Sequence, residues 1–166
     1  MSSFEQHLLK QHSFETPAEF RAAFDALLDI AQRQVRVYDQ NLSLLDIDQL
    51  PRHNRLRAFC VAGSGHRIEL LLDEIHHVAR DCPRLMQLVR DFGHVIKIRQ
   101  ADPNMPRPDQ AFALADRHAA LVRADKSVLH GTLHLDDAHA AILLHQEFER
   151  MWQRAQASVS ATTLGL

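Results

Sequence analysis

Residues 67–72, Arg67-Ile68-Glu69-Leu70-Leu71-Leu72, decide the fold class of this chain. The run is short and ends in three leucines, which is typical of a strand buried in a sheet. Gly63-Ser64-Gly65 before it has the composition of a helix stop and a turn. Because helical and strand patterns alternate on both sides of this run, the sequence predicts an α/β domain with helices packed on a largely parallel sheet.

The alternation extends toward the N-terminus. Thr16-Pro17-Ala18-Glu19 is a helix start, with an N-cap hydroxyl, a proline at the first helical position and a glutamate that reaches back to the cap. The apolar residues that follow have helical spacing: Phe20, Phe24, Leu27, Leu28 and Ala31. Residues 34–39 predict a strand, and residues 48–62 predict a second helix that is capped by Asp48.

Toward the C-terminus, Asp81 and Pro83 introduce a helix that Gly93 stops, and residues 94–99 predict a third strand. The proline-rich residues 102–108 predict a stiff loop. The segments that follow predict a hairpin (111–116 and 119–123), a strand (127–134) and a last helix, capped by Asp136 or Asp137, with Leu144, Phe148, Met151 and Trp152 on its inner face.

With 166 residues, 46% of them apolar and 24% charged, the chain has the composition of one globular domain. We expect a loose N-terminal extension (1–15), a single domain (16–157) and a frayed tail (158–166). No signal peptide or bilayer-spanning run is visible, and Cys60 and Cys82 lack a C-x-x-C spacing, so we expect a cytoplasmic protein with reduced thiols and no membrane association. The net charge of −2 argues against nucleic-acid binding.

The order of these elements resembles one half of the phospholipase D-like fold, over about residues 17–155. Residues 35–39 are similar to the first strand of that family, and residues 112–122 look like the hairpin that carries its catalytic motif. Phe148-Glu149-Arg150-Met151-Trp152 looks like its closing helix. The resemblance implies an α/β half-domain with a mixed, mostly parallel sheet flanked by helices on both faces.

The family's catalytic signature, H-x-K-x-x-x-x-D followed by G-S-x-N, is almost entirely absent. With Asp116 in the aspartate place, the histidine place holds Asp109 and the lysine place holds Ala111. Arg123, Ala124 and Lys126 stand where the glycine, serine and asparagine would be. The resemblance assigns the histidine the attack on phosphorus and the lysine the neutralisation of its oxygens, and neither an aspartate nor an alanine performs these tasks.

The chain resembles, more closely than it does the enzymes, a bacterial family of phospholipase D-like domains of unknown function that lack this motif. Members occur alone or behind acetyltransferase domains, so the resemblance implies a fold, no cofactor, and an acetyltransferase as one kind of protein partner. Because the enzymes place two halves side by side, a single half implies a homodimer.

Two sets of residues surround the expected pocket. Candidates for a rebuilt acid/base centre are Asp109, Asp116, His118 and His130. Candidates for binding a phosphate or a carboxylate are Arg99, Arg107, Arg117, Arg123 and Lys126, at the ends of the third strand and of the hairpin. The alternative for these cations is a solvated loop position in which they pair with Asp102, Asp109, Asp116 and Asp125.

The histidines near the last helix are possible metal ligands. His134, Asp136, Asp137 and His139 lie around a strand-to-helix turn, but their spacing does not stack them on a helix, so no metal site is predicted. Asp73 ends a strand, the position where α/β sheets place ligands, and is interpreted as a helix N-cap in preference to a general base.

The sequence therefore favours a non-catalytic binding or interaction module, homodimeric and without a cofactor, over an enzyme. The alternative is a divergent hydrolase with a rebuilt acid/base centre in the former phosphodiesterase pocket, with Asp109, Asp116 and a nearby histidine as its groups.

Overall fold

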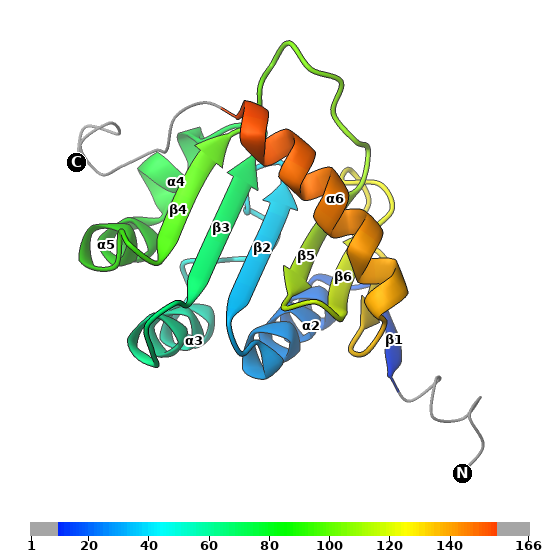
Figure 1. The fold of residues 1–166 in the computed structure, drawn as a ribbon, viewed down its shortest axis with the longest axis horizontal. Coiled ribbons are helices and arrows are strands. Elements are labelled where there is room, and N and C mark those ends of the chain that lie inside the picture. Colours follow the sequence, from blue (N-terminus) through cyan, green and yellow to red (C-terminus); the bar gives the residue numbers. More distant parts are fainter. Residues whose placement is uncertain (1–9, 156–166) are drawn as a thin grey trace.

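The computed structural model describes residues 10–155, which form one seven-stranded sheet in the order β1-β7-β6-β5-β2-β3-β4 (Figure 1). The strands are β1 (Gln11–Phe14), β2 (Gln34–Asp39), β3 (Arg67–Leu72), β4 (Ile96–Gln100), β5 (Ala111–Ala115), β6 (Ala119–Arg123) and β7 (Gly131–His134). The helices are α2 (Pro17–Ile30), α3 (Leu50–Val61), α4 (His76–Asp81), α5 (Pro83–Asp91) and α6 (Ala138–Arg154).

The sheet is mixed, and its largely parallel character was predicted wrongly. Only β2–β3 and β3–β4 pair in parallel, as the alternation in the first hundred residues requires. The other four pairings are antiparallel, because the hairpin β5–β6 is followed by β7 in the same meander and β1 adds to its edge. Short connections of a few residues join antiparallel strands only.

Helices cover both faces of the sheet, as expected. On one face, α2, α3, α4 and α5 pack on the apolar side chains of β2 to β4 and of the hairpin, and together they form the larger core. On the other face α6 crosses the sheet alone (Figure 1) and buries Phe148, Met151 and Trp152 against Tyr38 and Phe112. No helix within residues 10–155 combines the length and the apolar character needed to cross a membrane.

The helix caps follow the predictions in part. The Thr16 hydroxyl accepts the Glu19 N–H and Asp137 accepts the Ala140 N–H, so both helix starts are confirmed. Asp48 does not cap α3, which begins after Gln49 without a side-chain hydrogen bond. Its carboxylate instead accepts the N–H of Leu85, in the first turn of α5, at 2.8 Å. A cap can therefore come from a neighbouring element, which sequence spacing does not reveal.

The N-terminal extension is not loose over its last residues. Gln11–Phe14 pairs antiparallel with β7 and forms the edge of the sheet, and Phe14 is buried against Phe20 with a 5.1 Å separation of ring centroids. The boundary at residue 16 was therefore placed too late. The predicted loose residues 1–9 and the frayed tail 158–166 lie outside the described residues.

Candidate functional site

A buried ion pair between Arg123 and Asp39 lies at the carboxyl end of β2. Ala111 pairs with Arg123 across β5 and β6, and Tyr38 pairs with Phe112, so Asp39, Ala111 and Arg123 form one row across three strands. In this row the Nη2 of Arg123 donates to the Oδ1 of Asp39 at 2.6 Å. Because the lysine place holds the small side chain of Ala111, the guanidinium can cross β5 without obstruction.

Both members of the pair have further partners. Asp39 Oδ2 accepts the N–H of Leu42, and Arg123 Nη1 donates to the carbonyls of Lys126 and Val128 at 3.0 and 3.3 Å. The guanidinium also lies 5.0 Å from the ring centroid of Phe20 on α2. Arg123 is 2% exposed, and these contacts tie β2, the β6–β7 loop and α2 together.

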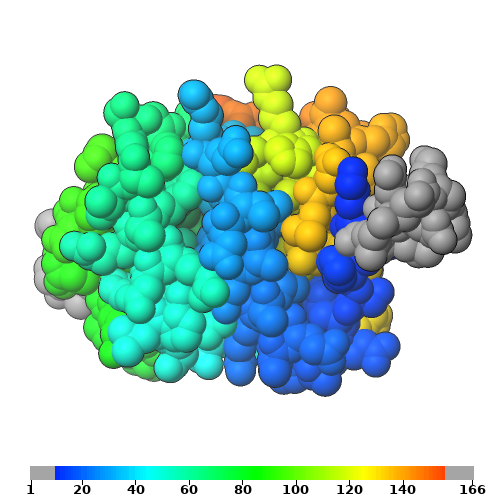
Figure 2. Space-filling model, turned by 90° about the horizontal axis from the view of Figure 1, so that it is seen from below, coloured from blue at the N-terminus to red at the C-terminus, as the bar shows by residue number. Residues whose placement is uncertain are grey.

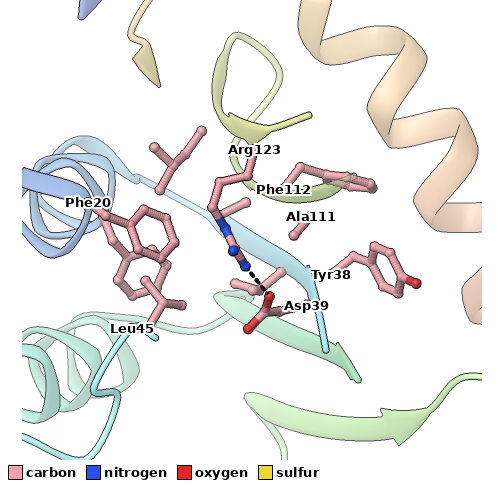
Figure 3. A pocket seen from close by; sticks show the side chains of 11 residues that line it. Phe20, Tyr38, Asp39, Leu45, Ala111, Phe112 and Arg123 are labelled. Atoms are coloured by element: carbon pink, nitrogen blue, oxygen red, sulfur yellow. Dashed lines mark hydrogen bonds and ion pairs between the residues drawn. The ribbon is translucent and has the colours of Figure 1, made fainter. Parts of the chain in front are cut away.

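The space around this pair is filled. The cavity lined by Phe20, Leu45, Ala111, Phe112, Asp39 and Arg123 has a volume of about 10 Å³ (Figure 3). A cavity of that size holds a single water molecule at most. A phosphodiester has no room between these side chains.

A second cluster lies at the same end of the sheet, on the face that α6 covers. Lys126 Nζ donates to Asp73 Oδ2 at 2.5 Å and to the Tyr38 hydroxyl at 3.0 Å, while that hydroxyl donates to Asp73 Oδ1 at 2.8 Å. Arg107 Nε stands 3.8 Å from Asp73 Oδ1. One buried carboxylate therefore holds a tyrosine and two cations.

The electrostatics of these clusters leave little reactive capacity. Burial, and then the hydrogen bond to Asp73, raise the pKa of the Tyr38 hydroxyl, so it stays protonated. The carboxylate of Asp39 occupies Arg123, and that of Asp73 occupies Lys126 and Arg107. The arrangement can stabilise the strand ends, because each of its cations lies within ion-pair distance of a carboxylate.

The four candidates for a rebuilt acid/base centre do not converge. Asp109 is exposed before β5, whereas Asp116 and His118 lie in the turn after β5. The whole length of β5 lies between the two aspartates, so they stand at opposite ends of the sheet. His130 lines a different surface depression, beside β7 and β1.

Asp116, which the resemblance sets in the aspartate place of the motif, has a structural role. Asp116 accepts three backbone N–H groups, from Gln32 at 2.9 Å, Arg33 at 2.8 Å and Gln34 at 3.1 Å. Its own backbone adopts φ 53°, which asparagine and aspartate tolerate better than most residues. The side chain thus fixes the β5–β6 turn to the start of β2.

The predicted ligand-binding cations are partly brought together. Arg107, Arg123 and Lys126 meet at the carboxyl ends of β2 and β3, although their partners are Asp39 and Asp73 and not the predicted loop acids. Asp102 and Asp125 instead accept neighbouring backbone N–H groups in their own turns. Arg99 packs elsewhere, 4.2 Å from the Trp152 ring centroid, and donates to the carbonyl of that residue.

The interpretation of Asp73 changes. Asp73 is not a helix cap, because α4 begins after Ile75 and the Asp73 carboxylate is turned to Tyr38 and Lys126. No group of three His, Cys, Asp or Glu side chains within residues 10–155 is arranged to hold a metal ion. His134 and Asp137 form a simple pair, with 3.8 Å between Nδ1 and Oδ2.

Sequence reasoning missed Tyr38 and Asp39, and it misjudged Asp73. A usable signal was present, since Asp39 and Asp73 each follow the apolar part of a predicted parallel strand. The carboxyl ends of neighbouring parallel strands lie at one edge of the sheet, where ligand sites form. Their partners Arg123 and Lys126 could not be assigned without the register of the hairpin.

Comparison with protein families gives one match of nearly full length. A family described as "Domain of unknown function (DUF7931)" matches residues 16–164. The chain belongs to this family. No curated protein matches the DUF7931 chain.

Solved structures similar to this DUF7931 chain include members of the phospholipase D family. One is Nuc from Salmonella typhimurium, with a TM-score of 0.63 and 12% identity over 90% of this chain and 97% of that one. Another is the phosphatidylserine synthase of Haemophilus influenzae, with a TM-score of 0.62 and 12% identity over 94% of this chain and 41% of that one. A similar structure of another description is TrmBL2, an archaeal chromatin protein with a novel mode of DNA binding. It has a TM-score of 0.66 and 12% identity over 90% of this chain and 53% of that one.

These similarities concern the fold. The chain spans about half of the TrmBL2 chain and nearly all of Nuc. The fold is phospholipase D-like, as the order of elements predicted, and the end of the sheet where Asp39 and Asp73 lie is the end at which α/β sheets generally bind ligands.

Proposed function

We propose that this domain is a non-catalytic phospholipase D-like module, in which the site expected for catalysis has become a stabilising centre. The observation that carries the proposal is the Arg123–Asp39 pair in the row of Ala111. In the phospholipase D-like enzymes that the sequence resembles, a lysine neutralises the phosphate oxygens. In this chain the carboxylate of Asp39 neutralises Arg123 instead.

Chemical reasons support the same conclusion. The exposed carboxylate of Asp109, in the histidine place, would repel a phosphodiester and is a weak nucleophile toward it. The cavity of about 10 Å³ does not admit a substrate. A divergent hydrolase built on Asp109, Asp116, His118 or His130 finds no support, because these side chains are dispersed over both ends of the sheet.

The catalytic part of the proposal is tested by incubating the purified protein with bis(p-nitrophenyl) phosphate, single-stranded DNA and phosphatidylcholine vesicles. Product should form at the rate of the buffer alone. Cleavage above that rate that disappears in Lys126→Ala, with the exposed Arg80→Ala unaffected, would show that the Tyr38–Asp73–Lys126 cluster is catalytic and would overturn the proposal.

We further propose that the domain acts as a homodimer, on the ground that phospholipase D-like enzymes place two halves side by side. Light scattering during size exclusion should give a mass of twice the 18.9 kDa of one chain. A monomer at micromolar concentration would remove this part and leave the closed site untouched. We also propose an acetyltransferase partner and a bacterial origin, both on the ground of the resemblance to the bacterial family that lacks the motif.

A cytoplasmic location is likewise proposed. Cys60 and Cys82 are free and buried. Burial raises the pKa of the Cys60 thiol to about 11 and that of Cys82 to about 12, so both are poorly reactive thiols. Two such side chains suit a reducing compartment. Thiol titration of protein purified without reductant should find both groups only after unfolding.

Nucleic-acid binding is the second candidate, favoured by the similarity to TrmBL2 and opposed by the net charge of −2. Binding of this kind weakens steeply with salt. Fluorescence anisotropy with labelled duplex DNA at two salt concentrations tests this candidate. Absent or salt-insensitive binding excludes nucleic-acid binding as the function.

A further inference from the structure

The opposite end of the sheet carries an open depression of about 450 Å³ that the proposed function does not use. Three segments line it: residues 32–34 at the start of β2, Gly65 and Arg67 at the start of β3, and residues 116–118 in the β5–β6 turn. Figure 2 views the molecule from this end, with these segments in blue, green-cyan and yellow-green.

Backbone hydrogen bonds hold the three segments in fixed register. Arg67 N donates to the Arg33 carbonyl at 3.0 Å, and Asp116 N donates to the Gln34 carbonyl at 2.9 Å. Neighbouring strands lie about 4.8 Å apart, so the rim brings side chains from adjacent strands within reach of one small ligand. The rim is built on strand ends, which makes its geometry rigid.

The rim is strongly cationic. Arg33, Arg67, Arg117 and His118 all line the depression and are all exposed. Within residues 10–155, no carboxylate lies within ion-pair distance of these three arginines, in contrast to the paired Arg107, Arg123 and Lys126 at the other end. Three guanidinium groups therefore face solvent around one hollow.

The acidic groups nearby are already engaged. Asp116 is the one carboxylate on the rim, and it accepts the N–H groups of residues 32–34. Glu149 on α6 accepts from Arg36 at 2.7 Å and from Gln153 at 2.7 Å. The formal charge of the rim is thus three positive against one negative, which leaves a net charge of +2.

We propose that this depression binds a small ligand through a phosphate or diphosphate group, held by Arg33, Arg67 and Arg117. Arginine presents a planar fork that matches phosphate oxygens in pairs. A ligand with two or more negative charges balances the rim, whereas a monocarboxylate does not. The volume falls in the range of about 300–1,000 Å³ that small-molecule sites occupy. The site is independent of the proposed function, since it lies at the other end of β2 from Asp39.

The test uses pyrophosphate as the probe, in calorimetry at low ionic strength and in backbone amide NMR of the full chain. Saturable binding is expected, with shifted amides confined to the three rim segments. Arg33→Ala, Arg67→Ala and Arg117→Ala should each weaken binding roughly tenfold, the loss expected for one charge-assisted contact. Arg117→Lys keeps the positive charge but not the planar guanidinium, so its affinity for pyrophosphate should lie between those of the wild type and Arg117→Ala.

The matched control is Arg80→Ala on α4, whose side chain is 81% exposed and which follows the carboxyl end of β3. This variant should bind pyrophosphate as the wild type does, and thermal melting should show all five variants folded. Absence of saturable binding, or an equal loss in Arg80→Ala, overturns the proposal. Binding of a single-stranded oligonucleotide through the same arginines without binding of pyrophosphate overturns it in favour of a nucleic-acid surface.

Discussion

The guanidinium of Arg123 crosses β5 in the row of Ala111 and meets the carboxylate of Asp39 at 2.6 Å. The crossing depends on the small side chain between them, because Ala111 is buried and lies in the cavity wall with both ion-pair partners (Figure 3). The small side chain at position 111 and the ion pair are therefore parts of one arrangement.

Restoring the motif should harm the protein and not activate it. In Asp109→His/Ala111→Lys, the long side chain at 111 must displace Arg123 or Phe20, and overpacking of this kind costs about 1–3 kcal/mol. Urea unfolding should show this loss, and bis(p-nitrophenyl) phosphate should remain uncleaved. Ala58→Lys on the exposed face of α3 is the control and should leave stability unchanged. A stable double variant that cleaves the substrate would refute the closed site.

The Asp116 carboxylate should prove important for stability. Asp116→Ala removes three hydrogen bonds to backbone N–H groups and also strains a residue at φ 53°, so we expect a loss of about 2 kcal/mol or more in urea unfolding. Asp116→Gly tolerates the backbone conformation and loses only the hydrogen bonds, so it should fall between Ala and the wild type. Equal stability of all three would contradict the assigned role.

His145 should make stability fall in mild acid. Its Nε2 donates to the Asp116 carbonyl at 2.6 Å, and its burial, with the charges of Arg36 and Arg117, lowers its pKa. As the pH drops below the ordinary histidine pKa of about 6.5, the unfolded chain takes up a proton that the folded chain does not, so folding loses stability.

The measurement is the free energy of unfolding at pH 7.5 and pH 5.5, compared between the wild type and His145→Gln. The amide keeps a donor for the Asp116 carbonyl but does not titrate, so the variant should lose less stability between the two pH values. The exposed His139→Gln serves as the control and should follow the wild type. If His145→Gln lost as much free energy of unfolding between pH 7.5 and pH 5.5 as the wild type, the lowered pKa of His145 would be contradicted.

The elements with strong local signals follow from the sequence. The Thr16 cap and the stripe from Phe20 to Leu28 define α2, and the hairpin turn at Arg117 is equally local. β1 escaped prediction because Gln11-His12-Ser13-Phe14 is polar and short, and its place depends on pairing with β7. Local pattern does not encode such an edge.

The candidate site was harder to predict than the fold. In the sequence, Asp39 and Asp73 are simply residues at the ends of predicted strands. Only the register of β2, β5 and β6 shows that Arg123 reaches Asp39. Residues 33, 67 and 117 lie far apart in the chain and meet at one rim through sheet topology. Charge totals conceal this, because the net charge of −2 averages a cationic end against the rest.

The most direct test is a double-mutant cycle on the pair, with Arg123→Met, Asp39→Leu and their combination compared in urea unfolding. Each single variant leaves a buried charge without its partner and should lose about 3–5 kcal/mol. The double variant should recover a large part of that loss, while Arg150→Ala, whose exposed pair with Glu147 is worth about 0–1 kcal/mol, should change little. Single variants as stable as the wild type would show that the pair is not a stabilising centre and would contradict the account.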